Sequence, residues 1–221
     1  MKAVVFDLDQ TLLDRDASLR AFLVGQHGRL LPNLNQAQLI ERFVSLDQNG
    51  MVWKGQVYQV LAAEFQINHV EWQILLDDYV NSFHNSAIGY DDLHVMLTQL
   101  QSDGYKLGVI TNGRFPFQLK NIQALNIEPF FDVILVSEKE GVRKPDPAIF
   151  ERALLRLGVT AVNAVMVGDN PVADIQGAKN VGLKAIWKQN KRSTHPLEAD
   201  AVCEKLMDIP RLIQTLCSPK G

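Results

Sequence analysis

Residues 4–12 read Val4-Val5-Phe6-Asp7-Leu8-Asp9-Gln10-Thr11-Leu12, an apolar run followed at once by two carboxylates. A short, continuous apolar run of this kind is typical of a strand that is buried on both faces of a parallel sheet. In open α/β sheets, binding and catalytic groups lie beyond the carboxyl ends of the strands. Asp7 and Asp9 are therefore candidate functional residues. The alternative is that they form a turn that caps the next helix.

Most of the remaining chain repeats this alternation of apolar strand and amphipathic helix. The predicted strands are Ala3–Phe6, Leu107–Ile110, Val133–Val136, Ala164–Val167 and Leu183–Trp187. Helices are predicted over Asp91–Ser102 and Pro147–Leu157, where apolar residues recur three and four apart and a glycine follows. The alternation predicts an α/β fold with a doubly wound parallel sheet of Rossmann-like type.

The segment of residues 15–87 breaks the alternation because it contains no clear strand. Helical spacing of apolar residues is found in Gln36–Leu46, Gln56–Phe65 and Val70–Phe83. A simple strand-to-helix connection is much shorter than this segment. We therefore predict two domains: an α/β catalytic core of residues 1–14 and 88–221, and an inserted, all-helical cap of residues 15–87. The few residues after Cys217 are expected to fray.

A second pair of carboxylates follows the strand Ala164–Val167. The turn is Gly168-Asp169-Asn170, and Asp174 begins the next helix, where the alternative role is a helix N-cap. Mg²⁺ prefers oxygen ligands and is typically held by one or two carboxylates plus a substrate phosphate. If the strand ends bring these residues close to Asp7 and Asp9, each close pair repels by a few kcal/mol at an effective dielectric of about 20. Such a cluster requires a cation, and we expect Mg²⁺.

Two further motifs supply groups that suit an anion. Thr111-Asn112-Gly113 follows the strand Leu107–Ile110 and offers a hydroxyl, an amide and backbone N–H groups. Lys144 lies in the loop Arg143-Lys144-Pro145-Asp146-Pro147, which two prolines stiffen. Taken alone, Lys144 is as well explained as a solvated surface charge. In combination with the acidic motifs, Thr111, Asn112 and Lys144 are the expected phosphate-binding residues.

In this order and combination, the four motifs resemble those of the haloacid dehalogenase (HAD) superfamily, most members of which are phosphatases. The resemblance covers roughly residues 1–14 and 88–205. The helical segment looks like the cap that subfamily I members carry after the first motif. The resemblance therefore implies the same fold and domain arrangement as the patterning does.

The resemblance also implies a role for each motif residue. Asp7 is similar to the nucleophile, and Asp9 to the general acid that protonates the leaving group and then activates water. Thr111 and Lys144 resemble the catalytic groups that hold the phosphoryl oxygens. The implied Mg²⁺ site takes its ligands from both acidic motifs: Asp7, Asp9 (through its backbone carbonyl), Asp169 and Asp174.

These roles predict a magnesium-dependent phosphatase that acts on a small phosphorylated metabolite, of the sugar phosphate or nucleotide class. The dehalogenases of the superfamily lack an aspartate where this chain has Asp9, because a halide needs no proton on leaving. A phosphomutase on the same scaffold and a non-enzymatic phospho-receiver domain are the alternatives. In the cap, Lys54 is a tentative substrate contact, and Trp53 and Trp72 are expected in the cap's core.

Composition argues against two classes of partner. The chain is 47% hydrophobic and 21% charged, with a formal net charge of −3 and no basic block. A nucleic-acid partner is not expected, because its phosphates call for a concentrated Lys/Arg face. With no secretory signal and no apolar run of about 20 residues, a membrane location is not expected either. We expect a cytoplasmic protein, and the choice between monomer and dimer stays open.

Overall fold

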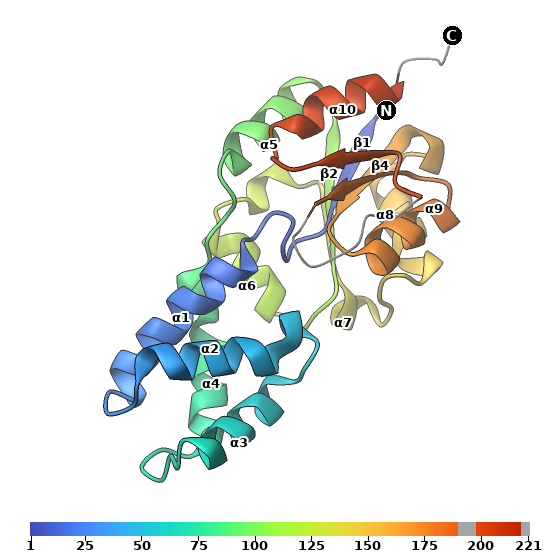
Figure 1. The fold of residues 1–221 in the computed structure, drawn as a ribbon. Helices are drawn as coiled ribbons and strands as arrows, with labels where there is room; N and C mark the ends of the chain where they lie inside the picture. Colours follow the sequence, from blue (N-terminus) through green and yellow to red (C-terminus); the bar gives the residue numbers. More distant parts are fainter. Residues whose placement is uncertain (190–197, 218–221) are drawn as a thin grey trace. The chain divides into compact units, whose positions relative to one another are not determined.

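The computed structural model describes residues 1–189 and 198–217, without the side chain of Cys217; the expected fraying after Cys217 concerns residues outside this range. The chain forms two compact units. One contains residues 1–15 and 88–221, and the other residues 16–87. Figure 1 shows the strands gathered in the first unit and four helices, α1 to α4, in the second.

The first unit is built on one six-stranded sheet in the order β3-β2-β1-β4-β5-β6. Its strands are β1 (Ala3–Phe6), β2 (Lys106–Thr111), β3 (Val133–Val136), β4 (Ala164–Gly168), β5 (Lys184–Lys188) and β6 (Ala201–Cys203). All neighbouring strands pair in parallel. The predicted doubly wound parallel α/β fold is confirmed. The sequence patterning missed β6, a three-residue edge strand.

Helices cover both faces of this sheet. They are α5 (Leu93–Ser102), α6 (Phe117–Ala124), α7 (Ser137–Glu140), α8 (Pro147–Leu157), α9 (Gly177–Asn180) and α10 (Asp208–Cys217). Figure 1 shows α8 and α9 on the side of the sheet opposite to α5 and α10. Apolar side chains of α8, among them Ile149 and Phe150, pack with Val5 and Met166 of the central strands. Because both faces are covered, the strands are apolar throughout, as the sequence shows.

The second unit consists of α1 (Arg15–Leu30), α2 (Gln36–Asp47), α3 (Lys54–Glu64) and α4 (Trp72–Ser82). Aromatic rings form much of its core: Phe22 contacts Tyr79 edge to face at 5.3 Å, and Phe43 contacts Tyr58 at 5.2 Å between ring centroids. Two tryptophans were expected in this core: Trp72 is half-buried, and for Trp53 the prediction is wrong. It is 41% exposed because it precedes α3, with its indole lying over Gly55.

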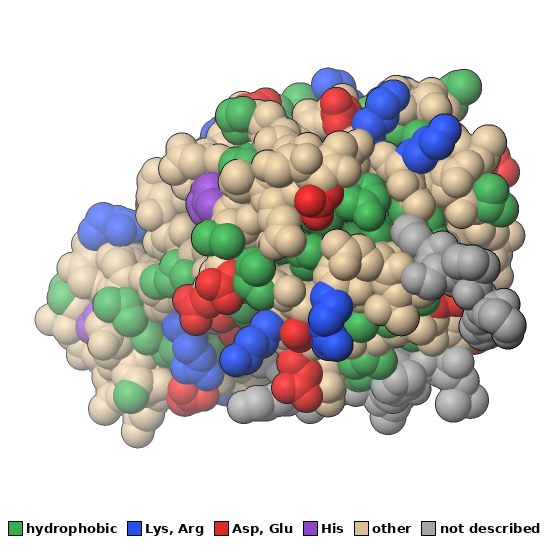
Figure 2. Space-filling model, turned by 90° about the horizontal axis from the view of Figure 1, so that it is seen from above, with side chains coloured by type: hydrophobic (Ala, Val, Ile, Leu, Met, Phe, Trp, Pro, Cys, Tyr) green, Lys and Arg blue, Asp and Glu red, His purple; other side chains and the backbone are tan. Residues whose placement is uncertain are grey.

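The surface carries interspersed charges. On the described part of the face in Figure 2, Lys and Arg side chains alternate with Asp and Glu. Among the described residues, no helix combines the length and the apolar character needed to cross a bilayer.

Candidate active site

Three strand ends meet where the order of the strands reverses. β1 lies between β2 and β4, and Phe6 at its end pairs with Val109 and Val167. Asp7, the first residue after β1, therefore lies at the same height as the ends of β2 and β4. Its N–H donates to the Val167 carbonyl at 2.9 Å. The reversal of strand order opens a crevice at the carboxyl edge of such sheets, which is where they bind ligands.

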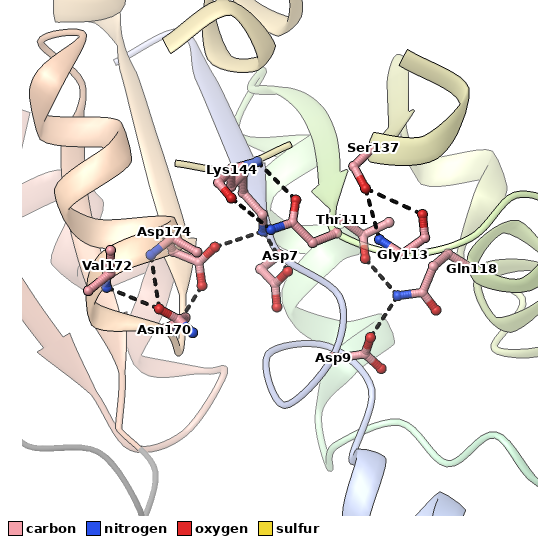
Figure 3. Close-up of polar contacts among 12 residues, drawn as sticks. Asp7, Asp9, Thr111, Gly113, Gln118, Ser137, Lys144, Asn170, Val172 and Asp174 are labelled. Atoms are coloured by element: carbon pink, nitrogen blue, oxygen red, sulfur yellow. Dashed lines mark hydrogen bonds and ion pairs between the residues drawn. The ribbon is translucent and has the colours of Figure 1, made fainter. Parts of the chain in front are cut away.

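A cluster of carboxylates occupies this position. Asp7, Asp169 and Asp174 each offer an oxygen within 4.8 Å of the others. Asp7 and Asp174 are buried, and Asp169 is half-buried. The Lys144 Nζ donates to Asp7 Oδ1 at 2.6 Å and to Asp174 Oδ1 at 2.7 Å, as the dashed lines in Figure 3 show. Three carboxylates and one ammonium leave the cluster with a formal charge of −2.

Burial makes this excess charge costly, and the pKa values show it. Burial raises the pKa of Asp7 to about 7, although Lys144 lowers it in part. Burial also raises the pKa of Asp169 to about 8, and the charge of Asp7 adds to the effect. Burial by itself lowers the pKa of Lys144, but Asp174 and Asp7 outweigh it and raise that pKa above its ordinary value. The cluster therefore favours protons or a second cation.

The donor set fits a divalent metal ion. Its three convergent groups are all carboxylate oxygens, which hard cations such as Mg²⁺ and Ca²⁺ prefer. The +2 charge of such an ion would also balance the formal charge of −2 on the three carboxylates and Lys144 taken together. The carboxylate of Asp9 is not part of this group of three.

The backbone of Asn170 and the glycine at position 168 determine where the Asp174 side chain lies. The helical turn after β4 is capped by Asn170, whose Oδ1 accepts from the N–H groups of Val172 and Ala173. Asp174 is thus not the N-cap, and its Oδ2 instead accepts from the Asn170 N–H at 2.9 Å. Its side chain packs so closely on Gly168 that a Cβ there would overlap it. The Gly-Asp-Asn turn therefore aims Asp174 back at the strand end.

Asn112 fixes the loop that carries Lys144. Its Nδ2 donates to the Lys144 carbonyl, and its Oδ1 accepts from the Lys144 N–H, both at 2.9 Å. This reciprocal pair holds the loop against the end of β2. Lys144 itself is only 2% exposed, so it is not the solvated surface lysine of the alternative interpretation.

Asp9 and Thr111 share a partner that the sequence did not indicate. The Gln118 Nε2 donates to Asp9 Oδ2 at 2.6 Å and to Thr111 Oγ1 at 2.8 Å (Figure 3). Gln118 is buried in the first turn of α6. A glutamine on a helix carries no recognisable signal for chemistry. Only its position in the structure brings it into the site.

Lys54, the tentative substrate contact, lies in the helical unit. It is buried and forms an ion pair with the buried Asp47, and its Nζ donates to the Val52 carbonyl at 3.0 Å. Asp47 also accepts from the Gly50 N–H at 2.8 Å. Within its own unit, Lys54 therefore orders the loop between α2 and α3.

Comparison with known proteins gives the family. The model of the haloacid dehalogenase-like hydrolase family matches residues 4–188. The chain thus belongs to the haloacid dehalogenase-like hydrolases. It is 42% identical, over 112 residues, to the glyceraldehyde 3-phosphate phosphatase of Pyrococcus abyssi, an alignment that takes in 49% of this chain and 47% of that relative. The chain thus spans about half the length of this curated relative.

Solved structures agree with this assignment. A HAD phosphatase from Thermococcus onnurineus is 28% identical, with a TM-score of 0.69 over 96% of this chain and 98% of that one. A 2-haloacid dehalogenase from Pseudomonas syringae is also 28% identical, with a TM-score of 0.65 over 97% and 99% of the two chains. The fold therefore serves both chemistries, and the choice between them depends on the site.

Proposed function

We propose that this chain is a magnesium-dependent phosphomonoesterase that forms an aspartyl phosphate on Asp7. The observation that carries the proposal is the hydrogen bond between the buried Lys144 and Asp7 within the cluster of three carboxylates. A nucleophile for phosphorus must be held in place and must approach a dianion without repelling it. The ammonium of Lys144 serves both needs.

Asp7, Asp169 and Asp174 would hold the Mg²⁺, together with the backbone carbonyl of Asp9. When bound, the ion supplies positive charge that lets the carboxylates ionise and lets the phosphate approach them. Lys144 and the Thr111 hydroxyl bind the phosphoryl oxygens. Because Thr111 Oγ1 accepts from Gln118, its own proton is left to donate to the phosphate.

The reaction runs in two displacements. A carboxylate oxygen of Asp7 attacks phosphorus, the bond from phosphorus to the leaving oxygen breaks, and the protonated Asp9 gives its proton to that oxygen. Water then attacks the phosphorus of the aspartyl phosphate while Asp9 takes the water's proton. The bond to Asp7 breaks, and inorganic phosphate and free enzyme result.

Asp9 favours phosphoester chemistry over dehalogenation. An alkoxide is a strong base and leaves readily only when it is protonated, whereas a halide leaves without a proton. Among phosphoesters, glyceraldehyde 3-phosphate is the first compound to assay, because it is the substrate in the name of the Pyrococcus relative. A cytoplasmic location stays a prediction.

The test is phosphate release from glyceraldehyde 3-phosphate, phosphoserine and 4-nitrophenyl phosphate, with Mg²⁺ and with excess chelator. Asp7→Asn is expected to lower turnover by at least about 1000-fold. Asp103→Asn, an exposed aspartate at the end of α5, is the matched control and is expected to keep full activity. The proposal would be contradicted if Asp7→Asn turned over substrate as fast as the wild type, or if the wild type kept its full activity in excess chelator. Stoichiometric free phosphate excludes a mutase.

A further inference from the structure

Gln118 joins the loop that carries Asp9 to a fixed strand. Its Nε2 has two hydrogens and donates one to Asp9 Oδ2 at 2.6 Å and the other to Thr111 Oγ1 at 2.8 Å. Thr111 ends β2 and is buried, so the sheet fixes its position. Asp9 instead lies in the turn after β1. Gln118 therefore uses Thr111 as an anchor and Asp9 as the group it positions.

A second buried residue fixes which way the Gln118 amide points. Asn121, one turn further along α6, donates from Nδ2 to Gln118 Oε1 at 3.2 Å. If the Gln118 amide were flipped, its Oε1 would face the Asp9 carboxylate and its NH₂ group would face the NH₂ group of Asn121. Asn121 is fully buried, and its Oδ1 has no hydrogen-bond partner among the described residues. A buried oxygen without a hydrogen-bond partner lowers the free energy of unfolding by about 1–3 kcal/mol. Stability alone therefore does not explain why residue 121 is an asparagine.

The backbone is also arranged to admit Gln118. A Cβ at Gly113 would lie 2.7 Å from Gln118 Cγ, closer than real contacts allow. Gly113 is tied to Ser137, whose Oγ accepts from the Gly113 N–H at 3.0 Å (Figure 3). The loop after β2 therefore leaves room for Gln118 only because residue 113 is glycine.

We propose that Gln118, supported by Asn121, is a positioning residue for the acid and base function of Asp9; the inference rests on the proposed function above. By donating to Oδ2, Gln118 assigns the proton of Asp9 to Oδ1. That oxygen gives its proton to the leaving oxygen in the first displacement. In the second displacement it takes a proton from water while the water oxygen bonds to phosphorus and the bond from phosphorus to the Asp7 oxygen breaks, which releases inorganic phosphate.

The kinetic consequence depends on the leaving group. An alkyl phosphate such as phosphoserine needs the proton of Asp9 to form the aspartyl phosphate, whereas 4-nitrophenolate leaves without it. Both substrates need Asp9 in the second step. Loss of Gln118 should therefore slow both steps for phosphoserine but only the second step for 4-nitrophenyl phosphate, which should show a burst of nitrophenolate.

The experiment compares Gln118→Met with Gln123→Met, an exposed glutamine on the same helix. For Gln118→Met, kcat for phosphoserine is expected to fall by about 10- to 100-fold. Its KM is expected to stay within about threefold, because Lys144 keeps its place and the Thr111 hydroxyl, although it loses the donor Gln118, keeps its own proton for the phosphate. The burst rate of nitrophenolate in Gln118→Met should equal that of the wild type. The control Gln123→Met should equal the wild type in kcat, KM and burst rate.

Asn121→Leu is the second variant, in case Gln118→Met folds poorly. It removes an unpartnered buried oxygen but also the donor to Gln118 Oε1, so the two effects on stability oppose each other. Its melting temperature is expected to stay within about 4 °C of the wild type while its kcat for phosphoserine falls. A kcat within twofold of the wild type in both variants would overturn the inference, as would equal loss of burst rate and kcat. A wild-type chain that releases no phosphate from any ester would overturn the proposed function, and this inference with it.

Discussion

Replacing Lys144 by methionine should reveal how strongly the carboxylate cluster depends on its one ammonium. Methionine keeps the length of the side chain but removes the charge. Lys144 donates to Asp7 at 2.6 Å and to Asp174 at 2.7 Å, and all three residues are buried. The variant therefore leaves Asp7 and Asp174 without the ammonium that they share, in a place that water scarcely reaches.

The expected loss is large and depends on pH. Removing one partner of a buried ion pair costs about 3–5 kcal/mol. The folded-state pKa of Asp7, about 7, lies above its ordinary value of 3.8. The protonated carboxyl therefore contributes stability that is fully present below the unfolded pKa and is lost as pH rises through 7. The penalty in Lys144→Met should thus be greatest near pH 8 and much smaller near pH 5, where the folded state can hold protons.

Thermal unfolding in chelator, at pH 5 and pH 8, measures this penalty. For a chain of this size, 3–5 kcal/mol corresponds to a fall in melting temperature of roughly 6–20 °C at pH 8. Lys205→Met, at an exposed position, is the control and should shift the melting temperature by less than about 2 °C. An equal fall at both pH values, or a fall no larger than the control's at pH 8, would refute the electrostatic reasoning.

Two further predictions concern the metal site. Mg²⁺ at 100 times the Kd that it has at pH 8 should stabilise the wild type by about 2.7 kcal/mol at that pH, and the same Mg²⁺ concentration is then used at pH 5. The rise in melting temperature should be larger at pH 8 than at pH 5, because ligating carboxylates must be ionised; a rise independent of pH would contradict this. Gly168→Ala should displace Asp174 and weaken the Mg²⁺-induced rise, whereas Gly28→Ala, whose Cβ meets no neighbour, should leave it unchanged. Thermal unfolding with and without Mg²⁺ checks both, and full stabilisation of Gly168→Ala would count against the assignment of Asp174.

The fold was predictable because its signals are local. Strands buried on both faces need continuous apolar runs, so four-residue stretches such as Ala3–Phe6 and Val133–Val136 stand out in the sequence. The helix Pro147–Leu157 was predicted to the residue, because Asp146 caps it and Gly158 ends it with a φ of 66°. β6 was missed because three residues at a sheet edge are too few to show a period.

The site was predictable only where a strand end carries it. Residues that follow neighbouring parallel strands must converge, so Asp7, Thr111 and Asp169 could be placed together from the sequence. Gln118 could not be, because its approach depends on how α6 is rotated and on the space above Gly113. The same limit applies to Asn112, whose amide binds the Lys144 backbone rather than standing free for an anion. Side-chain partners of this kind are decided by packing, which no local pattern records.

Uncharged hydrogen-bond donors hold the carboxylate cluster in place without neutralising its charge. The Asn170 N–H holds Asp174, and the Trp187 indole donates to the Asp169 carbonyl at 2.8 Å. These bonds fix geometry but leave the formal charge of −2. A site selected for stability alone would replace the carboxylates with apolar residues, since buried ion clusters often weaken a fold. The chain instead keeps three carboxylates close together at the crevice, an arrangement that suits a metal ion and that folding by itself does not need.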